Sequence, residues 1–579
     1  MHMVTVQFVY NGIAMAADAD ATIAEALVSN GVRVGNYSVR LRRWREEYHP
    51  FREVPSAWVT VDGVPNVNAY RVRVQNGMEI ASQTKRNILT SIASRWGPGF
   101  YYRKFKKPEF VRKLFFSGIE RNNDYGGPVN PNIAINNRIA EFGFSDARTL
   151  DVDVLLIGAG RAGIAASLAI APEGASVVML DRMSLSSIEK VHGHVIAEAA
   201  EPPQLMGPAF SGGQTFASVL AAKGITLMPE TTVFGYYEGV FAAVSGESRI
   251  VLLKPRLVAL CAGSEEIKPR FRNNDLPGIM TAASFIALPD VLKASYAKGD
   301  TTLFTESRVS LHETAEIVST AHVKNLVIGY ECDEQQRKRV AESFSIDVTR
   351  VFAGTIASAD GRRSVEQVTV RTPEGNSVQL TTELLIVAGR RQPRIEIPCL
   401  MDMPLRFDDV MHMPLPAVDE TFSAGNVFVC CSLAGMSGRA SIASGLICGS
   451  ALSERLGRKG ANGVELELWQ SLTGRIEKDR SYPDAGTAEE CVLCPCVDVT
   501  AGDVADAIAG GYDTLNMIKR YTGLFMGPCQ GARCMRNSLE VFSALSGRDA
   551  DMPTVRSPIT PVYLGALALA ELQGVVDRQ

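Results

Sequence analysis

The first 260 residues of this 579-residue chain contain no cysteine, and five of its eleven cysteines fall between Cys491 and Cys534. A disulfide framework would spread its cysteines over the domains that it stabilises, so a secreted, disulfide-linked protein is excluded. The clustering instead predicts metal binding in a reducing cytoplasm.

Strong net charge and long apolar runs are also lacking. The formal net charge is −4, which gives no general attraction for a polyanion and predicts no nucleic-acid partner. The chain has no run of eighteen apolar residues and no charged-then-apolar leader, so neither a membrane span nor a secretory signal is predicted. A chain of this length is too long for one hydrophobic core, and three or four domains are expected.

Four of the clustered cysteines form two close pairs, Cys494 with Cys496 and Cys529 with Cys534. Thiolates are soft ligands, and four of them satisfy either a [2Fe–2S] cluster or a tetrahedral zinc ion. The run Gly527-Pro528 and a further glycine at 531 leave backbone N–H groups free to approach the sulfurs and tune a cluster. Zinc gains little from such hydrogen bonds, so the pattern favours the cluster, with zinc as the alternative.

The segment between the two pairs predicts two short helices. Thr500 with Asp503 three residues on is typical of one helix start, and Thr514 of the other. Cys491, three residues before the first pair, is interpreted as a spare thiol, with replacement of Cys494 as the alternative.

A glycine-rich turn follows the apolar strand 153–157 and opens a helix. Gly158 allows the tight turn, Gly160 lets a pyrophosphate reach the backbone, and Gly163 lets helix and strand pack. Asp181, about twenty residues on, would take a ribose hydroxyl. The pattern predicts a dinucleotide site that includes Ala159, Ala162 and Arg182 and leaves FAD, NAD and a simple adenine nucleotide open.

The strand that ends at Ala262 and Gly263 resembles a return to the nucleotide domain in two-dinucleotide flavoproteins. A later stretch departs from the family pattern, because Cys430 and Cys431 precede Ser432 and Gly435 where related flavoproteins have an Ala-Gly-Asp whose Asp contacts the ribityl chain; Ser432 can still hydrogen-bond. The resemblance implies that Ala262, Gly263, Ser432 and Gly435 contribute to the nucleotide site. Adjacent cysteines on a strand point to opposite faces, so Cys430 and Cys431 are predicted to be core residues instead of ligands.

An NAD(P)H-binding insertion would occupy residues 291–384, and its motif is degenerate. The strand that ends at Gly329 continues into Tyr330, without the second and third glycines, and Asp333 and Glu334 stand where phosphate would sit. Carboxylates repel pyrophosphate there, so no working NAD(P)H site is predicted. The strand 384–388 is expected to return to the nucleotide domain.

The first ninety residues alternate apolar and polar side chains up to an Asn11-Gly12 turn, a hairpin signal, before a helix at 22–29 and strands at 58–63 and 71–77. This order resembles the plant-type ferredoxin-like domain at the front of heterotetrameric sarcosine oxidase alpha subunits. Without thiolates it cannot hold iron–sulfur, so a packing or docking role is expected. The basic, aromatic stretch 40–52 is interpreted as a solvated loop or as a contact with a partner subunit or a flavin phosphate.

The cysteine run 493–500 and 527–534 resembles the [2Fe–2S] domain of bacterioferritin-associated-ferredoxin type in opine oxidase alpha subunits. The expected fold is α/β: a two-dinucleotide-binding flavoprotein with an N-terminal cysteine-free ferredoxin-like β-grasp domain and a small C-terminal helical [2Fe–2S] domain. The expected boundaries are 1–90 for the ferredoxin-like domain, 91–150 for a connector, 151–290 with 385–455 for the dinucleotide domain, 291–384 for the insertion, 456–485 for a linker and 486–579 for the cluster domain and tail.

The resemblance implies an alpha subunit of a heteromeric flavin-dependent amine or amino-acid dehydrogenase, of the opine oxidase, proline dehydrogenase and sarcosine oxidase group. The substrate would be oxidised on an FAD-bearing beta subunit that resembles D-amino-acid oxidase, and electrons would pass through a flavin, with FMN at the interface as a candidate, to the cluster. A small ferredoxin-like subunit is a further candidate partner in this hetero-oligomer. No catalytic residue is predicted in this chain.

Two other functions remain open at this point. One is a self-contained NAD(P)H-dependent flavin and iron–sulfur reductase, which the degenerate insertion disfavours. The other is a scaffold subunit whose nucleotide is purely structural.

Overall fold

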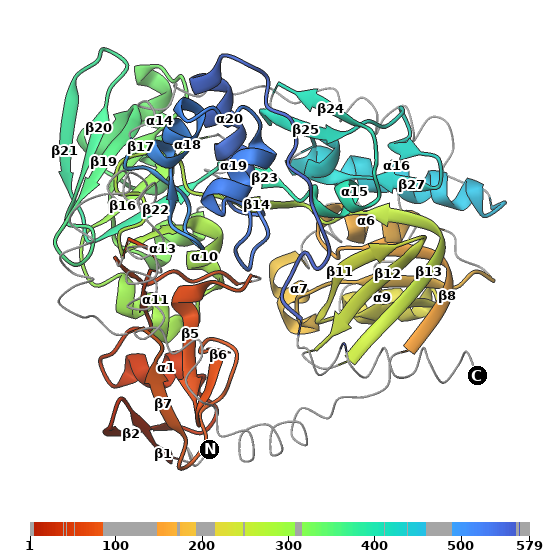
Figure 1. Ribbon diagram of the computed structural model, residues 1–579, viewed down its shortest axis with the longest axis horizontal. Coiled ribbons are helices and arrows are strands. Elements are labelled where there is room, and N and C mark those ends of the chain that lie inside the picture. Colours follow the sequence, from red (N-terminus) through yellow and green to blue (C-terminus); the bar gives the residue numbers. More distant parts are fainter. Residues whose placement is uncertain are drawn as a thin grey trace. The chain divides into compact units, whose positions relative to one another are not determined.

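The computed structural model describes residues 5–84 without 39, 42 and 51, residues 148–192 without 171–173, residues 215–458 without 247–248, 307–314, 410 and 437, residues 489–562, and residue 567. The expected connector up to residue 147, and the expected linker from residue 459 on, lie outside these ranges. The chain divides into two units (Figure 1). Unit 1 comprises Met1–Arg138, Glu266–Arg390 and Asp479–Pro553, and unit 2 comprises Ile139–Glu265, Arg391–Lys478 and Thr554–Gln579.

The N-terminal domain of unit 1 is a mixed sheet covered by one helix. The sheet has the order β2-β1-β7-β5-β6. Its strands are β1 (Thr5–Tyr10), β2 (Ile13–Asp18), β5 (Trp58–Val61), β6 (Val64–Asn68) and β7 (Glu79–Ser82), its helix is α1 (Ile23–Ser29), and its shorter elements are β3 (Asn36–Tyr37), β4 (Trp44–Arg45) and η1 (Pro55–Ala57).

Local signals in this domain are confirmed. Asn11 and Gly12 both have positive φ, at 49° and 82°, as a two-residue hairpin turn requires. Thr22 caps α1 in a capping box with Glu25. The strand predicted at 71–77 is wrong: Val72 O accepts from Ile23 N and Val74 N donates to Ala21 O, so this stretch secures the start of α1 instead of joining the sheet.

A second domain of unit 1 is built on a parallel sheet of order β15-β22-β16-β17-β18. Its elements are β15 (Ile279–Thr281), α10 (Ala282–Ala287), α11 (Asp290–Tyr296), β16 (Thr301–Thr305), α13 (Ala315–Thr320), β17 (Val323–Ile328), α14 (Glu334–Phe344), η3 (Val348–Arg350), β18 (Val351–Ala353) and β22 (Leu384–Ala388), with an antiparallel sheet of β19 (Thr355–Asp360), β20 (Gln367–Arg371) and β21 (Ser377–Thr381). The strand expected to return to the nucleotide domain, β22, instead lies inside this sheet between β15 and β16.

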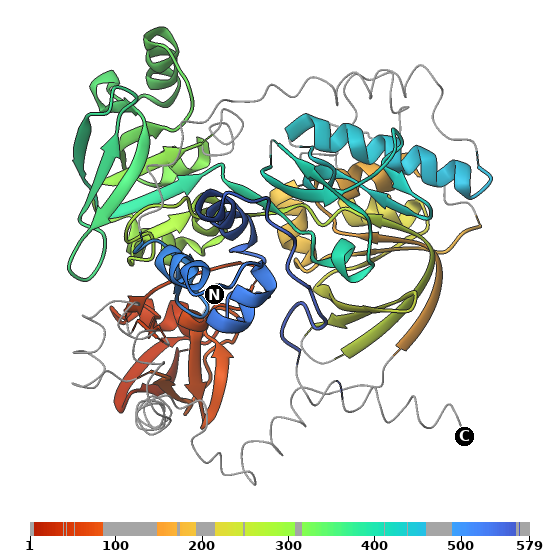
Figure 2. The ribbon, with the colours of Figure 1, turned by 45° about the horizontal axis from the view of Figure 1, so that its top comes forward.

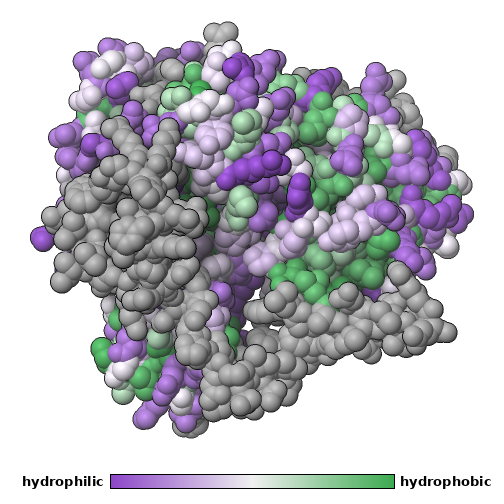
Figure 3. All heavy atoms as spheres, in the orientation of Figure 1, coloured by the Kyte–Doolittle hydropathy of each residue, from purple (hydrophilic) through white to green (hydrophobic). Residues whose placement is uncertain are grey.

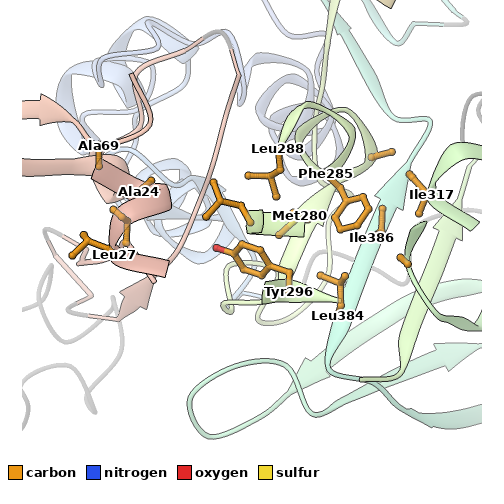
Figure 4. Close-up of a cluster of buried hydrophobic side chains, with 14 of the residues drawn as sticks. Ala24, Leu27, Ala69, Met280, Phe285, Leu288, Tyr296, Ile317, Leu384 and Ile386 are labelled. Atoms are coloured by element: carbon orange, nitrogen blue, oxygen red, sulfur yellow. The ribbon is translucent and has the colours of Figure 1, made fainter. Parts of the chain in front are cut away.

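The two domains share one hydrophobic core. In Figure 4, Ala24 and Leu27 of α1 lie at one end of the cluster, and Tyr296 and Leu288 lie between them and the parallel sheet. Leu384 continues the cluster into that sheet. Leu27 and Leu384 are fully buried. Burying a side chain of this size stabilises a fold by about 1.5–3 kcal/mol. The N-terminal domain is therefore fixed to its neighbour by packing.

The C-terminal part of unit 1 holds three helices and a two-stranded sheet. Its elements are β28 (Val492–Cys494), β29 (Val499–Thr500), α18 (Ala501–Ala509), α19 (Leu515–Thr522) and α20 (Met535–Ser546). Both predicted helix starts are confirmed, because Thr500 and Asp503 form a capping box and the Thr514 side chain accepts from Met517 N.

Unit 2 is built on an eight-stranded sheet in which β10-β9-β8-β13 run parallel, β27 adds to β13, and β12 and β11 continue antiparallel. The strands are β8 (Arg148–Ile157), β9 (Val177–Leu180), β10 (Ile225–Met228), β11 (Thr231–Tyr237), β12 (Val240–Ser245), β13 (Arg249–Leu260), β26 (Ser423–Ala424) and β27 (Val427–Val429). The other elements are α6 (Arg161–Ala169), α7 (Leu185–His192), α9 (Phe216–Ala222), β14 (Ser264–Glu266), β23 (Arg391–Pro393), α15 (Glu396–Leu400), β24 (Leu405–Asp408), β25 (Met413–Pro416), η4 (Cys431–Ala434) and α16 (Gly438–Arg455).

The close packing of α16 on α6, visible in Figure 2, depends on glycine. A Cβ atom at Gly445 would lie 2.2 Å from the carbonyl oxygen of Ala162, and one at Gly449 would lie 2.3 Å from that of Ala166. Helix α6, which follows the glycine-rich turn, is therefore packed directly against the backbone of α16.

Hydrophobic residues gather on one face of unit 2 over the antiparallel strands β11 to β13 (Figure 3). Within the described residues, no helix has both the length and the apolarity needed to cross a bilayer.

Candidate redox centre and dinucleotide-binding loop

The four predicted ligand cysteines lie together in unit 1. All are at most 4% exposed, and the Sγ atoms of Cys496 and Cys529 are 3.6 Å apart. Cys494 interacts with the thiols of both Cys496 and Cys534. Two elements position these residues: Cys494 is the last residue of β28, and Cys534 is the N-cap of helix α20.

The donor set consists of sulfur alone, which fits a [2Fe–2S] cluster. No three His, Cys, Asp or Glu side chains among the described residues are arranged to hold a single metal ion. A two-iron cluster takes two sulfurs per iron, so its four ligands need not converge on one point as those of zinc do. Their role as ligands stays a prediction that this grouping supports.

Glycine lets the two cysteine loops approach each other. A Cβ atom at Gly527 would lie 2.3 Å from Cβ of Cys496. Phe525 N donates a hydrogen bond to the Cys534 thiol, the kind of backbone contact that tunes a cluster.

The pKa values of the four thiols are raised above the ordinary value of cysteine. The neighbouring Cys496 thiol, and then burial, raise the pKa of Cys529 well above its ordinary value. Binding a metal as thiolates would therefore release protons. The Arg533 guanidinium lies close enough to act against this increase in the pKa of both Cys496 and Cys529.

Cys491, the fifth cysteine of this part of the chain, contacts Asn274. Its Sγ is 3.6 Å from Nδ2 of Asn274, whose amide oxygen in turn accepts from Val492 N. This arrangement favours Cys494 over Cys491 as the first ligand.

Part of the basic stretch at 40–52 packs on the cysteine loops of the same chain. Arg45 is 2% exposed, its Nη1 donates to Pro495 O at 2.5 Å, and its Nη2 lies 2.5 Å from Oδ1 of Asp498. Arg40 forms an ion pair with Asp503. The solvated-loop interpretation is wrong for these residues, while Arg42 lies outside the described residues.

A small cavity adjoins these loops. It has a volume of about 40 Å³, enough for water, and its lining includes Glu47, Lys268, Asp275, Pro495 and Arg533. Sequence reasoning named none of these as site residues, since their charges come together only in the folded chain.

In unit 2, the predicted dinucleotide loop has the geometry that its glycines imply. Gly158 has φ of 111°, and a Cβ there would lie 2.4 Å from Cys261 O. A Cβ at Gly163 would lie 1.8 Å from Gly158 O, whereas a Cβ at Gly160 would meet nothing within 4 Å. Gly160 therefore borders open space at the start of α6, where a helix N-terminus favours a phosphate.

Asp181 makes contacts that the sequence did not indicate. One carboxylate oxygen accepts from Ala159 N at 2.6 Å and the other from Met183 N at 2.7 Å. The carboxylate thus stabilises the glycine turn, and ribose binding by Asp181 stays a prediction.

The remaining predicted residues follow the carboxyl ends of β13 and β27, which pair with each other as parallel strands. Ser432 Oγ lies 3.2 Å from Ser264 Oγ, just after Ala262 and Gly263, and Gly435 ends η4 with φ of 75°. Ligands of open α/β sheets bind at this end of the strands. Arg182, which was predicted as part of the nucleotide site, forms an ion pair with Glu265 at 3.4 Å. Glu265 was not predicted from the sequence.

Cys261, Cys430, Cys431 and Cys448 of unit 2 are core residues. Cys430 and Cys431 are buried, as predicted, and Cys430 interacts with the buried thiols of Cys261 and Cys448. The hydrogen bond with Cys430, and then burial, raise the pKa of the Cys261 thiol well above its ordinary value.

The degenerate insertion motif has a structural use. Asp333 caps α14, accepting from Gln336 N at 2.7 Å, and Gln336 Oε1 accepts from Asp333 N at 2.9 Å. A carboxylate therefore already occupies the helix N-terminus that would otherwise receive phosphate.

Comparison with known proteins adds to this geometry. Residues 4–85 match a family described as a 2Fe-2S iron-sulfur cluster binding domain, and residues 493–571 match the sarcosine oxidase A3 domain. The alpha subunit of sarcosine oxidase from Rhizobium meliloti (strain 1021) is 23% identical over 602 aligned residues, which cover 97% of this chain and 58% of that protein. An opine oxidase subunit from Agrobacterium tumefaciens (strain Ach5) is 24% identical over 467 residues, which cover 72% of this chain and 91% of that protein.

The chain is similar to these sarcosine oxidase and opine oxidase subunits. The predicted resemblance is confirmed. The crystal structure of L-proline dehydrogenase from P. horikoshii shares the fold, with a TM-score of 0.63, 20% identity and 98% coverage of both chains. This chain spans little more than half the length of the sarcosine oxidase subunit. The N-terminal domain matches a cluster-binding family but contains no cysteine, because the first cysteine of the chain is Cys261.

Proposed function

We propose that this chain is the electron-transferring alpha subunit of a heteromeric flavoenzyme that dehydrogenates the CH–NH bond of a secondary amine or amino acid. The substrates named for its relatives, sarcosine, opines and proline, define the class. The observation that carries the proposal is the gathering of four buried cysteines within the part that matches the sarcosine oxidase A3 domain.

The residues of this chain supply binding and insulation. Cys494, Cys496, Cys529 and Cys534 would hold a [2Fe–2S] cluster, which takes up single electrons when bound. Their burial keeps water from the sulfurs. The loop at Gly158, Gly160 and Gly163 would hold the pyrophosphate of FAD or NAD, or the phosphates of an adenine nucleotide.

The substrate would react on a partner, an FAD-bearing beta subunit that resembles D-amino-acid oxidase. Further components would be FMN and a small ferredoxin-like subunit. A nucleophile–base pair or hydrolytic metal motif was not found in the sequence, in agreement with this division of labour.

Purification of the chain together with its partner from its source cells tests the proposal. The complex should contain iron and extractable flavin, and sarcosine, proline or an opine should bleach the flavin. A complex that contains iron and flavin but reacts only with NADH would contradict the proposal and favour a self-contained reductase.

A further inference from the structure

One short segment of the N-terminal domain, Trp44–Glu47, contacts both cysteine loops. Arg45 contacts the first loop twice, at Pro495 O, between the two cysteines of the first pair, and at Asp498, two residues beyond it. Asp498 is fully buried and has φ of 57°, a left-handed conformation that costs a non-glycine residue energy. Arg40 N and Leu41 N also donate to its Oδ2, at 2.7 and 2.9 Å, and compensate for that cost.

Glu47, two residues after Arg45, contacts the second loop. Its carboxylate accepts from Nη1 and Nη2 of Arg533 at 3.4 and 3.3 Å, and it pairs with Lys268 at 3.2 Å. Arg533 lies beside Cys534 in the chain and acts electrostatically on Cys496 and Cys529.

Charge compensation in this segment is nearly complete and takes place out of water. Burial would raise the pKa of the Glu47 carboxyl, but Arg533 and Lys268 more than offset it and hold that pKa well below its ordinary value. Arg45 balances Asp498 and Asp275, to which its Nη2 lies 2.5 and 3.1 Å away. Removing the charge of Arg45 or of Glu47 therefore leaves a buried charge without its partner, at Asp498 in the first loop or at Arg533 in the second.

The domain that carries the segment is fixed to its neighbour in unit 1 by packing. Helix α1 of the same domain shares a hydrophobic core with α11 and the parallel sheet, as Figure 4 shows. A domain without cysteines of its own is thus fixed where two of its side chains hold the loops that carry the cysteines.

We propose that the Trp44–Glu47 segment clamps both cysteine loops and sets the reduction potential of the cluster that they hold. The proposal rests on the [2Fe–2S] cluster of the proposed function. It gives the cysteine-free ferredoxin-like domain a role in the redox centre of another domain: Arg45 stabilises the reduced cluster, and Glu47, by neutralising Arg533, restrains that effect.

The two residues should act in opposite directions. Reduction adds one negative charge to the cluster, so nearby positive charge raises the potential and nearby negative charge lowers it. Arg45→Gln removes the positive charge that pairs with Asp498, whereas Asp275 keeps its ion pair with Arg43, and the variant should lower the midpoint potential. Glu47→Gln leaves Arg533 and Lys268 unbalanced and should raise it. A shift of about tenfold in the one-electron equilibrium, or ~59 mV, is expected in each case.

Redox titration of the purified complex, followed by the electron paramagnetic resonance of the reduced cluster, measures these shifts. Arg71→Gln is the matched control, because Arg71 pairs with Glu53 at 2.9 Å in the same domain without contacting either loop, and it should leave the potential unchanged. Arg45→Lys keeps the positive charge but cannot contact Pro495 O and Asp498 at the same time. Its midpoint potential should be close to that of the wild type, and its iron content should be lower.

The outcomes separate this inference from the proposed function. Wild-type complex without iron overturns the proposed function and the clamp together. A normal cluster in the wild type, with shifts of the same sign or no shifts in Arg45→Gln and Glu47→Gln, overturns the clamp alone. If Arg45→Gln does not fold, the isosteric Glu47→Gln still decides, since an unchanged or lowered potential in that variant contradicts the proposal.

Discussion

Gly527 stands against Cys496 so closely that a Cβ atom at position 527 would lie 2.3 Å from Cβ of the cysteine. Real side chains do not approach to that distance, so any other residue at 527 must push apart the loops that carry Cys496 and Cys529.

Gly527→Ala should therefore reduce cluster loading. Wild-type chain should contain about two irons, as a [2Fe–2S] cluster requires, and the variant less than about half of that. The control is Gly510→Ala in the same part of the chain, where φ is −78° and the nearest atoms are 3.3 Å from the added Cβ. Iron and sulfide analysis after anaerobic purification measures the effect, and equal iron in both variants would show that the loops do not need to meet.

The dinucleotide loop predicts two different results from two glycines. Gly160→Val should abolish nucleotide binding and leave the melting temperature of the ligand-free chain nearly unchanged, because the added Cβ meets no protein atom within 4 Å. Gly163→Val should destabilise the fold itself, because its Cβ would lie 1.8 Å from Gly158 O. Nucleotide released by heat and the melting curve of each variant distinguish the two. Retained nucleotide in Gly160→Val would mean that the ligand binds elsewhere.

Division of labour between subunits predicts the behaviour of Cys529→Ser in the complex. Loss of one thiolate should impair the cluster, so turnover with an acceptor that draws electrons from it should fall at least about tenfold. Substrate should still bleach the flavin of the partner at close to the wild-type rate. Stopped-flow absorbance beside steady-state turnover separates the steps. Cys491→Ser serves as the control, because Cys491 is not a predicted ligand and its Sγ lies 3.6 Å from Nδ2 of Asn274. A slowed bleaching step would place the chemistry in this chain.

Features encoded over short distances in the sequence were predictable. The Asn11-Gly12 turn, the Thr22 and Thr500 caps and the glycine loop each depend on residues only a few positions apart. The strand expected near Arg71 failed because Val72 and Val74 bond to the start of α1, which the alternating pattern cannot show.

The clamp was not predictable for a similar reason. Arg45 and Pro495 are 450 residues apart, and a basic stretch has the same composition whether it faces water or buried carboxylates. The strand 384–388 was misplaced because its apolar sequence fits the core of either parallel sheet, and only pairing with β15 and β16 decides between them. Composition therefore identified the cysteines, while their charged surroundings required the fold.

The start of α14 should not bind a nicotinamide cofactor. In the insertion, the Asp333 carboxylate already receives the N–H of Gln336 at the start of α14, and a dinucleotide phosphate there would have to displace it against like charge. The isolated chain should therefore neither bind NADH or NADPH in calorimetry nor reduce a dye with them. Asp333→Asn removes the negative charge and keeps a cap, so it tests whether charge alone prevents binding; binding gained in that variant would show that the rest of the site is intact. NADH-dependent dye reduction by the wild-type chain alone would instead favour the self-contained reductase, because electrons would then enter without a partner subunit.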